Sequence, residues 1–307
     1  MTNPPASTPS ATPLRIGLLG TGPWARATHA PALAAHPGVE LSGVWGRRPE
    51  AAAELAAAHA TTAYEKVDAL FSASDAVAVA LPPDVQAPLA ARAAAAGCHL
   101  LLDKPVATTV DGARAVVDAA ERAGVASVVF CTLRFAPEVA AWISEQAAVP
   151  GWFVGRAQWL GALFSPDADS PYAASPWRKD KGGLWDVGPH ALSVLLPVLG
   201  DAAEVTAAGG PGDTVHLVLR HASGASSSVT LSLSAPIEAA GVQVELRGNH
   251  GVATLPAGGG RPLVPFAAAV DALLDAVRTG VPHACDARFG LRLTEILAAA
   301  EGQLHPN

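Results

Sequence analysis

Leu14-Arg15-Ile16-Gly17-Leu18-Leu19-Gly20-Thr21-Gly22-Pro23-Trp24-Ala25 is the stretch that decides the fold of this sequence. Its apolar start predicts a buried strand, and the two glycines a tight turn that leads into a helix ending near residue 35. Gly20 suits the turn, Gly22 lets a pyrophosphate approach the backbone, and the small Ala25 lets helix and strand pack closely. In this strand–turn–helix context the string predicts a dinucleotide site; elsewhere it would be an ordinary glycine turn. The predicted contacts are Gly20, Thr21, Gly22, Pro23 and Trp24.

Short apolar runs alternate with alanine-rich helical segments from this turn to Cys131. The predicted strands are residues 39–45, 75–81, 98–102 and 126–131, and the predicted helices are residues 49–59, 85–96 and 110–123. Strands separated by helices pair in parallel, because parallel neighbours need a long connection. We therefore predict a doubly wound parallel sheet, that is, a Rossmann domain, over residues 14–135.

Beyond Phe135 the pattern changes to strands with a period of two, as in Ser228-Val229-Thr230-Leu231-Ser232-Leu233. The segments 152–164, 204–208, 213–221, 226–235, 242–246 and 252–255 predict antiparallel strands, and 189–199, 265–278 and 286–301 predict helices. Residues 136–307 are therefore expected to form an α+β substrate-binding domain with a large open, mostly antiparallel sheet. The fold class is α/β plus α+β. Residues 1–13, rich in Pro, Ser and Thr, predict a disordered tail and not a secretory signal.

Composition narrows the class of protein. A chain of 307 residues is long for one core, which favours two domains. A net charge of −7 argues against a general nucleic-acid or anionic-membrane binder. No uncharged apolar run is long enough to span a membrane. Cys98, Cys131 and Cys285 form neither a disulfide framework nor zinc-type spacing, so we expect a reducing cytoplasm and no metal site.

The end of the second strand bears on the choice between NAD and NADP. An acid there bonds the ribose 2′-hydroxyl of NAD, whereas arginine accommodates the 2′-phosphate of NADP. Here the strand ends in Gly46-Arg47-Arg48, without an acid. Gly46 leaves room and the arginines supply planar donors, which favours NADP over NAD. The alternative is that Arg47 and Arg48 are solvated loop residues without a role in cofactor binding.

Several strings, in this order and spacing, resemble the glucose-fructose oxidoreductase, inositol dehydrogenase and rhizopine-catabolism (Gfo/Idh/MocA) oxidoreductases over about residues 14–302. They are Gly20-Thr21-Gly22, Leu81-Pro82-Pro83, Ala96-Gly97-Cys98-His99, Asp103-Lys104-Pro105, Arg134-Phe135-x-Pro137, and Gly182-Gly183-Leu184-Trp185-Asp186-Val187-Gly188-Pro189-His190. The resemblance implies further cofactor contacts at Leu81, Pro82, Pro83, Asp103, Lys104 and Arg134, although Arg134 could simply join the two domains.

The resemblance also implies a catalytic set. Lys104 is similar to the lysine of the family's Glu-Lys-Pro motif, with Asp103 in place of the glutamate, and would stabilise charge on a substrate oxygen. Asp186 and His190 are similar to the family's Asp-His pair, the carboxylate folding back to orient the imidazole for proton transfer. An aspartate cap beside a satisfied buried histidine is the structural alternative. Trp177 and Arg178, with Lys104, Asp186 and His190, would bind the substrate; loop packing explains the first two equally well.

The sequence departs from the family pattern at two positions. Ser193 stands where many relatives have an acid three residues after the histidine, and Gln86 stands where a histidine often follows the Pro-Pro turn. Both differences are expected to bear on recognition of sugar hydroxyls, so the substrate stays open. His29 is expected to be helical and structural.

These features together predict an NADP-preferring oxidoreductase of a small sugar, polyol or cyclic carbonyl compound. A cofactor-sensing regulator without turnover is one alternative, and an imine, dihydrodiol or biliverdin-type reductase is another. The small residues Ser226, Ser228, Thr230 and Ser232 are expected to form an outward sheet face. That face predicts a homodimer or homotetramer assembled through the C-terminal sheet, and the resemblance implies the same, since the family commonly assembles in this way.

Overall fold

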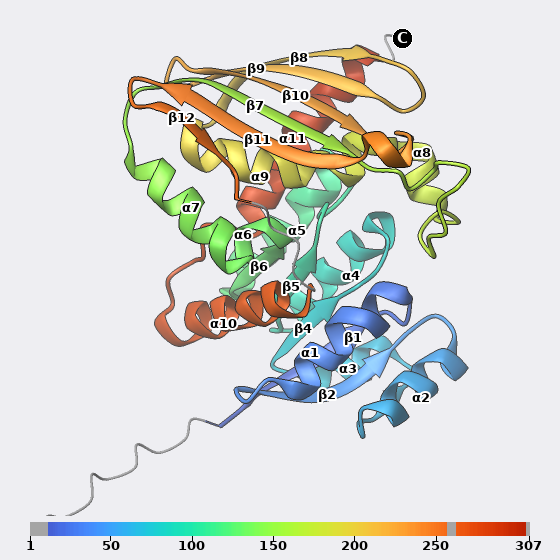
Figure 1. The fold of residues 1–307 in the computed structure, drawn as a ribbon. Helices are drawn as coiled ribbons and strands as arrows, with labels where there is room; N and C mark the ends of the chain where they lie inside the picture. Colours follow the sequence, from blue (N-terminus) through green and yellow to red (C-terminus); the bar gives the residue numbers. More distant parts are fainter. Residues whose placement is uncertain (1–11, 257–261, 305–307) are drawn as a thin grey trace, which may run out of the picture.

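The computed structural model describes residues 12–256 and 262–304, which form two β-sheets with helices packed around and between them (Figure 1). Of the predicted tail, only residues 12 and 13 lie within the described part. Within these ranges no helix combines the length and the apolar character needed to cross a membrane.

The first sheet is the predicted doubly wound parallel sheet. Its strands are β1 (Leu14–Leu19), β2 (Val39–Trp45), β3 (Ala63–Tyr64), β4 (Ala76–Val79), β5 (His99–Asp103) and β6 (Ser127–Phe130). They lie in the order β3-β2-β1-β4-β5-β6, and every neighbouring pair is parallel. In this order the winding reverses between β1 and β4, where sheets of this kind hold their ligands.

Helices cover both faces of this sheet. They are η1 (Ala25–His29, a π-helical turn), α1 (Ala30–Ala35), α2 (Pro49–Ala58), α3 (Val67–Ser72), α4 (Pro83–Ala95) and α5 (Val110–Ala123). All residues of β4 and β6 are buried, as expected for parallel strands covered on both sides. Both ends of α5 are capped: the Thr109 side chain accepts from the Gly112 N–H, and Gly124 adopts the left-handed conformation. The short β3 and α3 were not predicted.

The second sheet is mixed but mostly antiparallel. Its strands are β7 (Trp152–Leu160), β8 (Ala202–Gly209), β9 (Val215–His221), β10 (Ser226–Ser232), β11 (Gly241–Gly248) and β12 (Gly251–Thr254), in the order β12-β11-β7-β10-β9-β8. The predicted mostly antiparallel sheet is confirmed, and the exception is one pair, β7 and β10, which runs parallel. Residues 161–225 separate these two strands, which gives the long connection that parallel pairing requires.

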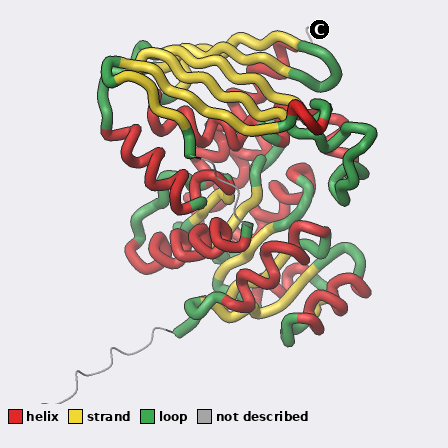
Figure 2. Tube along the Cα trace, in the orientation of Figure 1, coloured by secondary structure: helices red, strands yellow, loops and turns green. Residues whose placement is uncertain are grey.

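Helices α8 (Pro176–Asp186), α9 (Gly188–Leu199) and α11 (Ala287–Leu304) contact one face of the second sheet, and the other face points away from the molecule (Figures 1 and 2). Ser226 and Ser228 are exposed on that outer face and Thr230 is half-buried. Ser232 was predicted to join them, but it is buried and its hydroxyl donates to the Asp213 carboxylate. Strand β10 ends at Ser232, and there the side chain points into the protein instead of toward the outer face.

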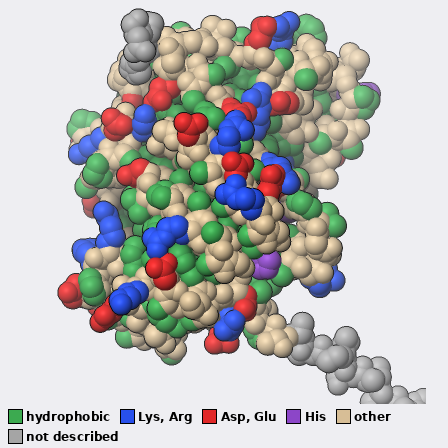
Figure 3. Space-filling model, turned by 180° about the vertical axis from the view of Figure 1, so that it is seen from behind, with side chains coloured by type: hydrophobic (Ala, Val, Ile, Leu, Met, Phe, Trp, Pro, Cys, Tyr) green, Lys and Arg blue, Asp and Glu red, His purple; other side chains and the backbone are tan. Residues whose placement is uncertain are grey.

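The remaining helices are α6 (Thr132–Phe135), α7 (Pro137–Ala148), the single 3₁₀ turn η2 (Ile237–Ala239) and α10 (Leu263–Thr279). Of these, only α10 was predicted. Although it follows the second sheet in sequence, α10 packs against β5, β6 and α1 of the first sheet. On the face seen in Figure 3, acidic and basic side chains are interspersed and do not segregate by sign.

Candidate active site

The turn after β1 has the geometry of a ligand cradle. Gly20 has φ +126°, and a Cβ there would lie 2.3 Å from the Ala80 carbonyl oxygen, so the fold itself requires glycine. A Cβ at Gly22 would meet nothing within 4 Å, which leaves its backbone open to a ligand. Ala25 is fully buried where the helix meets the strand. The predicted structural roles of Gly20 and Ala25 are thus confirmed, whereas the contact of Gly22 with a pyrophosphate stays a prediction.

A cavity of about 460 Å³ opens beside this turn, at the switch point between β1 and β4. Its lining consists of Gly20, Thr21, Gly22, Gly46, Arg47, Arg48, Ala80, Leu81 and Pro82. All but Ala80 are predicted cofactor contacts, which the fold brings together from the ends of three strands; Pro83 begins α4 directly after them. The volume is in the usual range for a small-molecule site, and the open backbone at Gly22 fits a dinucleotide.

The basic side of this cavity comes from the end of β2. Arg47 and Arg48 are exposed, and in the part of the chain that the structure describes neither forms an ion pair with an acid. A Cβ at Gly46 would lie 2.7 Å from the Thr21 methyl group, so glycine lets the two loops approach each other. Two available guanidinium groups at this end of the cavity can bind an anionic group.

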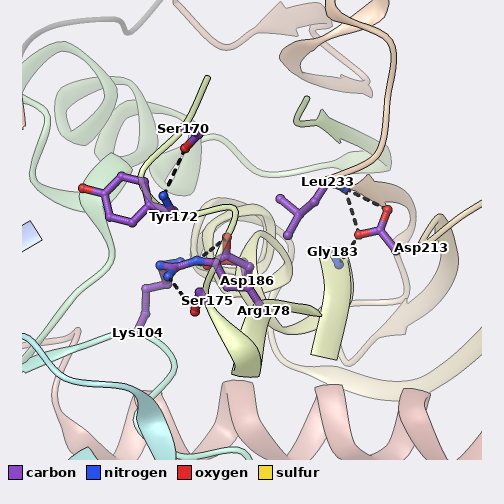
Figure 4. A network of polar contacts seen from close by, with 9 residues as sticks. All are labelled: Lys104, Ser170, Tyr172, Ser175, Arg178, Gly183, Asp186, Asp213 and Leu233. Atoms are coloured by element: carbon purple, nitrogen blue, oxygen red, sulfur yellow. Dashed lines mark hydrogen bonds and ion pairs between the residues drawn. The ribbon is translucent and has the colours of Figure 1, made fainter. Parts of the chain in front are cut away.

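Lys104 follows β5 and joins the two halves of the molecule (Figure 4). Its ammonium donates to the Asp186 backbone oxygen at 2.6 Å and to Asp186 Oδ1 at 2.8 Å. The two side chains are only 13% and 11% exposed. The Lys104–Pro105 peptide is cis. Two residues 82 positions apart in sequence thus form one buried ion pair.

Asp186 is held by a second cation. Arg178 Nε donates to its Oδ2 at 3.1 Å. Burial alone would raise the pKa of the Asp186 carboxyl, but the charges of Lys104 and Arg178 outweigh it and lower the pKa to about 2. The predicted fold-back of Asp186 onto the His190 ring is not what the structure shows: no hydrogen bond between them occurs among the described residues. Two full cations are stronger partners than a neutral imidazole.

His190 lies in the first turn of α9, where its ring stacks on Trp159 with centroids 4.8 Å apart. It is buried, and its Nδ1 makes no hydrogen bond. Burial, followed by the nearby charge of Lys104, places its pKa well below the ordinary value. The charge of Asp186 acts in the opposite direction but is outweighed, so the ring is neutral at neutral pH.

Arg178 and Trp177 stand beside this cluster in the first turn of α8. The Arg178 guanidinium lies 4.6 Å from the Trp177 ring centroid and 5.2 Å from that of Tyr172, and its Nη1 donates to Ser175 Oγ at 3.5 Å. Of the predicted substrate residues, Lys104 and Arg178 thus both contact Asp186 (Figure 4). Sequence reasoning missed Tyr172 and Ser175, since both lie in an irregular segment without a motif.

Asp213 is a further missed residue. Its carboxylate accepts from the Gly183 N–H at 2.8 Å, from Ser232 Oγ at 2.8 Å and from the Leu233 and Ser234 N–H groups at 3.0 Å. A Cβ at Gly183 would lie 2.8 Å from the Ser232 backbone. Asp213 therefore fixes the glycine kink of α8 against the end of β10, three residues before Asp186 (Figure 4). The double glycine was a usable signal, whereas nothing in the sequence marks Asp213.

Asp103 is a buried acid directly before Lys104. Burial raises its pKa to about 7, although the charges of Lys104 and Arg178 act in the opposite direction. His29 Nε2 lies 4.0 Å from its carboxylate. Burial lowers the pKa of His29 to about 3, and its ring packs 4.2 Å from that of Phe266, in keeping with the predicted structural role.

Three residues lie elsewhere than expected. Arg134 sits over the Phe289 ring at 5.9 Å and lines a separate cavity with His283, so the structure does not bring it to the turn after β1. Ser193 is fully buried and bonds the His190 carbonyl of its own helix. Gln86 is fully buried and bonds backbone groups. Both side chains therefore serve the interior of the protein, and the expected effect of these two departures on substrate recognition stays a prediction.

Comparison with known proteins agrees with this architecture. The family model described as "Oxidoreductase family, NAD-binding Rossmann fold" matches residues 14–130, and the GFO/IDH/MocA C-terminal domain matches residues 153–254. Among curated relatives, a dTDP-3,4-didehydro-2,6-dideoxy-alpha-D-glucose 3-reductase of Streptomyces violaceoruber is 32% identical over 66% of this chain and 59% of its own length. A glucose-6-phosphate 3-dehydrogenase of Bacillus subtilis (strain 168) is 32% identical over 59% of this chain and 52% of its own length. The chain thus spans somewhat more than half the length of such relatives.

Solved structures share the fold over nearly the whole chain. Levoglucosan dehydrogenase, in complex with NADH and levoglucosan, superposes with a TM-score of 0.81 at 20% identity, covering 95% of this chain and 97% of the other. An NAD binding oxidoreductase from Klebsiella pneumoniae superposes with a TM-score of 0.82 at 23% identity, with the same coverage. At these identities the likeness concerns the fold. Together with the two family models, it shows that this chain belongs to the Gfo/Idh/MocA oxidoreductase family.

Proposed function

We propose that this protein is an NAD(P)-dependent oxidoreductase that interconverts a hydroxyl and a carbonyl group on a small sugar, polyol or cyclic carbonyl compound. The observation that carries the proposal is the buried ion pair of Lys104 with Asp186, next to His190. It lies between two halves of the molecule: one contains the cavity beside the glycine turn, and the other contributes the imidazole. Charged groups in a dry site are typical of catalysis.

Each residue of the cluster has a defined task in this proposal. A nicotinamide dinucleotide held by the cavity residues Gly22, Arg47 and Arg48 would supply the hydride acceptor or donor. In the oxidative direction the neutral His190 accepts the hydroxyl proton at Nε2, the ring nitrogen other than the buried Nδ1. Lys104 donates two of its three N–H bonds to Asp186, which leaves the third for the oxygen on which negative charge develops. Arg178 keeps Asp186 ionised and in place.

We propose a preference for NADP over NAD. The support is the pair of exposed arginines, Arg47 and Arg48, on the wall of the cavity at the end of β2, where no acid stands. An acid in that position would favour the ribose hydroxyls of NAD. A planar guanidinium is suited to a 2′-phosphate because it can donate two parallel hydrogen bonds.

The substrate class rests on relatives as well as on the site. The named relatives act on hexose derivatives, among them a sugar phosphate and a nucleotide-linked sugar. In this chain the rings of Trp177 and Tyr172 pack against the Arg178 guanidinium, and the ring of Trp159 packs against that of His190. Flat apolar walls with a few polar groups are the ordinary composition of a site for a small polar molecule.

The proposal is tested by following nicotinamide absorbance with NAD(H) and NADP(H) against a panel of sugars, sugar phosphates, inositols and cyclic carbonyl compounds. Turnover that is abolished by Lys104→Met would support it. Dinucleotide binding without turnover on any substrate would favour the cofactor-sensing alternative. Calorimetry that detected no dinucleotide binding would reject both.

We also propose that the protein forms a homodimer or homotetramer through the outer face of the second sheet. That face carries the exposed Ser226 and Ser228, and Val218 is 58% exposed. Small side chains on a flat sheet allow a second sheet to approach closely. Light scattering tests this assembly. A cytoplasmic location is proposed as well, since Cys98, Cys131 and Cys285 are free thiols.

A further inference from the structure

Gln86 lies in the second turn of α4, fully buried, and all of its side-chain bonds reach one short segment. Nε2 donates to the carbonyl oxygens of Asp103, Pro105 and Val106 at 2.8, 3.0 and 3.2 Å. Oε1 accepts from the Asp103 N–H at 2.9 Å. These four contacts lie before and after Lys104 in the chain. The carboxamide therefore clamps the backbone on both sides of the lysine.

The clamp lies between the two parts of the site. Helix α4 begins at Pro83, immediately after Leu81 and Pro82 of the cavity wall. The clamped segment carries Lys104, whose ammonium reaches Asp186 in the other half. One side chain thus fixes the lysine-bearing segment to the helix that starts at the cavity.

We infer that Gln86 is a positioning residue, which fixes the backbone of residues 103–106 so that the Lys104 ammonium is held against Asp186. This inference rests on the proposed function, because it assigns a role in turnover that acts through Lys104. Gln86 contacts the backbone only, so its effect on the substrate is indirect.

Glutamine suits this position because of its donors and acceptors. A carboxamide offers two N–H donors and an acceptor oxygen, which together serve one N–H group and three carbonyls. Leucine has a similar volume but serves none of them, and buried groups without partners are costly. A neutral histidine supplies one donor and one acceptor, so it can replace part of the clamp.

A double-mutant cycle tests the role in turnover. Gln86→Leu should lower kcat roughly 100-fold, the loss expected when a reacting group moves by about 1 Å, and leave the Kd for NADPH nearly unchanged. In the Lys104→Met background the same substitution should have no further effect on kcat, since residues that act as a unit are not additive. Equal losses in both backgrounds would overturn the inference. Gln86→His, which keeps part of the clamp, should show an intermediate kcat and serves for the same cycle if Gln86→Leu does not fold.

A second readout does not depend on turnover. Labelling by an amine-acylating reagent, followed by mass spectrometry, should be faster at Lys104 in Gln86→Leu than in the parent, relative to the exposed Lys66. The control is His221→Leu: this buried ring bonds the Gly200 oxygen and Ser227 Oγ, both outside the site. It should lower stability but leave kcat and the labelling of Lys104 unchanged. If the parent turned over no substrate, the proposed function would fail, and labelling alone would decide the role of Gln86. Unchanged labelling in Gln86→Leu would refute it.

Discussion

Replacement of Asp103 by asparagine should stabilise the protein, and the gain should grow with pH. Burial raises the pKa of this carboxyl from 3.8 to about 7 in the folded chain, whereas the unfolded chain keeps the ordinary value. Between these values the unfolded state releases the proton first, so each rise in pH favours unfolding. Asparagine resembles the protonated acid and cannot ionise. The variant therefore avoids a cost that the parent bears at neutral pH.

The magnitude follows from the two pKa values. Their separation corresponds to about 4 kcal/mol, which is nearly all present above pH 7, falls to roughly 2 kcal/mol at pH 5 and vanishes below pH 4. Because the Asp103 side chain is 15% exposed, some solvation remains and these figures are upper values. The neutral His29 beside it cannot offset the charge.

Urea unfolding followed by tryptophan fluorescence, at pH 5 and pH 8 without dinucleotide, measures the effect. Asp103→Asn should raise the free energy of unfolding more at pH 8 than at pH 5. Asp75→Asn is the control of opposite sign, because the hydrogen bond from Arg15 lowers the pKa of Asp75. Its contribution is fully present above the ordinary pKa, so the control should lose the same stability at both pH values. A change in Asp103→Asn that is equal at both pH values, or destabilising at pH 8, would refute the reasoning.

Three further outcomes are expected. Lys104→Met should lower turnover by about 10²–10⁴-fold and leave NADPH binding by calorimetry nearly unchanged; turnover within twofold of the parent would contradict its role. Arg47→Ala combined with Arg48→Ala should raise the KM for NADPH by roughly tenfold or more and leave the KM for NADH unaltered, since only one cofactor has the 2′-phosphate; steady-state kinetics with both cofactors decide this. Asp213→Ala leaves three backbone N–H groups and a hydroxyl without their acceptor, so it should cost about 1–3 kcal/mol of stability by urea unfolding and also lower kcat. A stable variant with normal kcat would show that the glycine kink holds without it.

The sequence predicted the first sheet well because its signals are local. Buried parallel strands are continuous apolar runs, and the turn after Leu19 contains Gly20, whose conformation only glycine adopts comfortably. The position of the cavity was also predictable. The carboxyl ends of neighbouring parallel strands meet at one edge of the sheet, so Gly22, Arg47 and Leu81, which follow three of these strands, lie close together.

The pairing within the catalytic cluster could not be predicted in this way. The sequence singled out Lys104, Arg178 and Asp186. Which cation pairs with the Asp186 carboxylate, however, depends on how the two halves of the molecule pack against each other. The sequence suggested His190 as the partner of Asp186, and burial made that ring neutral. Asp213 lacked any signal, and Gln86 was marked only as a departure from the family pattern, because their partners are mostly backbone groups, which every residue has. The parallel pairing of β7 with β10 likewise depends on the path of the intervening chain.

Because α10 packs against the first sheet although it follows the second sheet in sequence, it limits the order in which the parts of the chain can fold. Phe266, Val270 and Leu273 are fully buried, and the Phe266 ring lies 5.0 Å from that of Phe130 at the end of β6. During synthesis the apolar flank of the Rossmann half that α10 covers therefore stays open to water until the second sheet, which precedes α10 in the chain, has been made. Any exchange of halves between relatives, in evolution or in the laboratory, has to carry this late helix together with the early half.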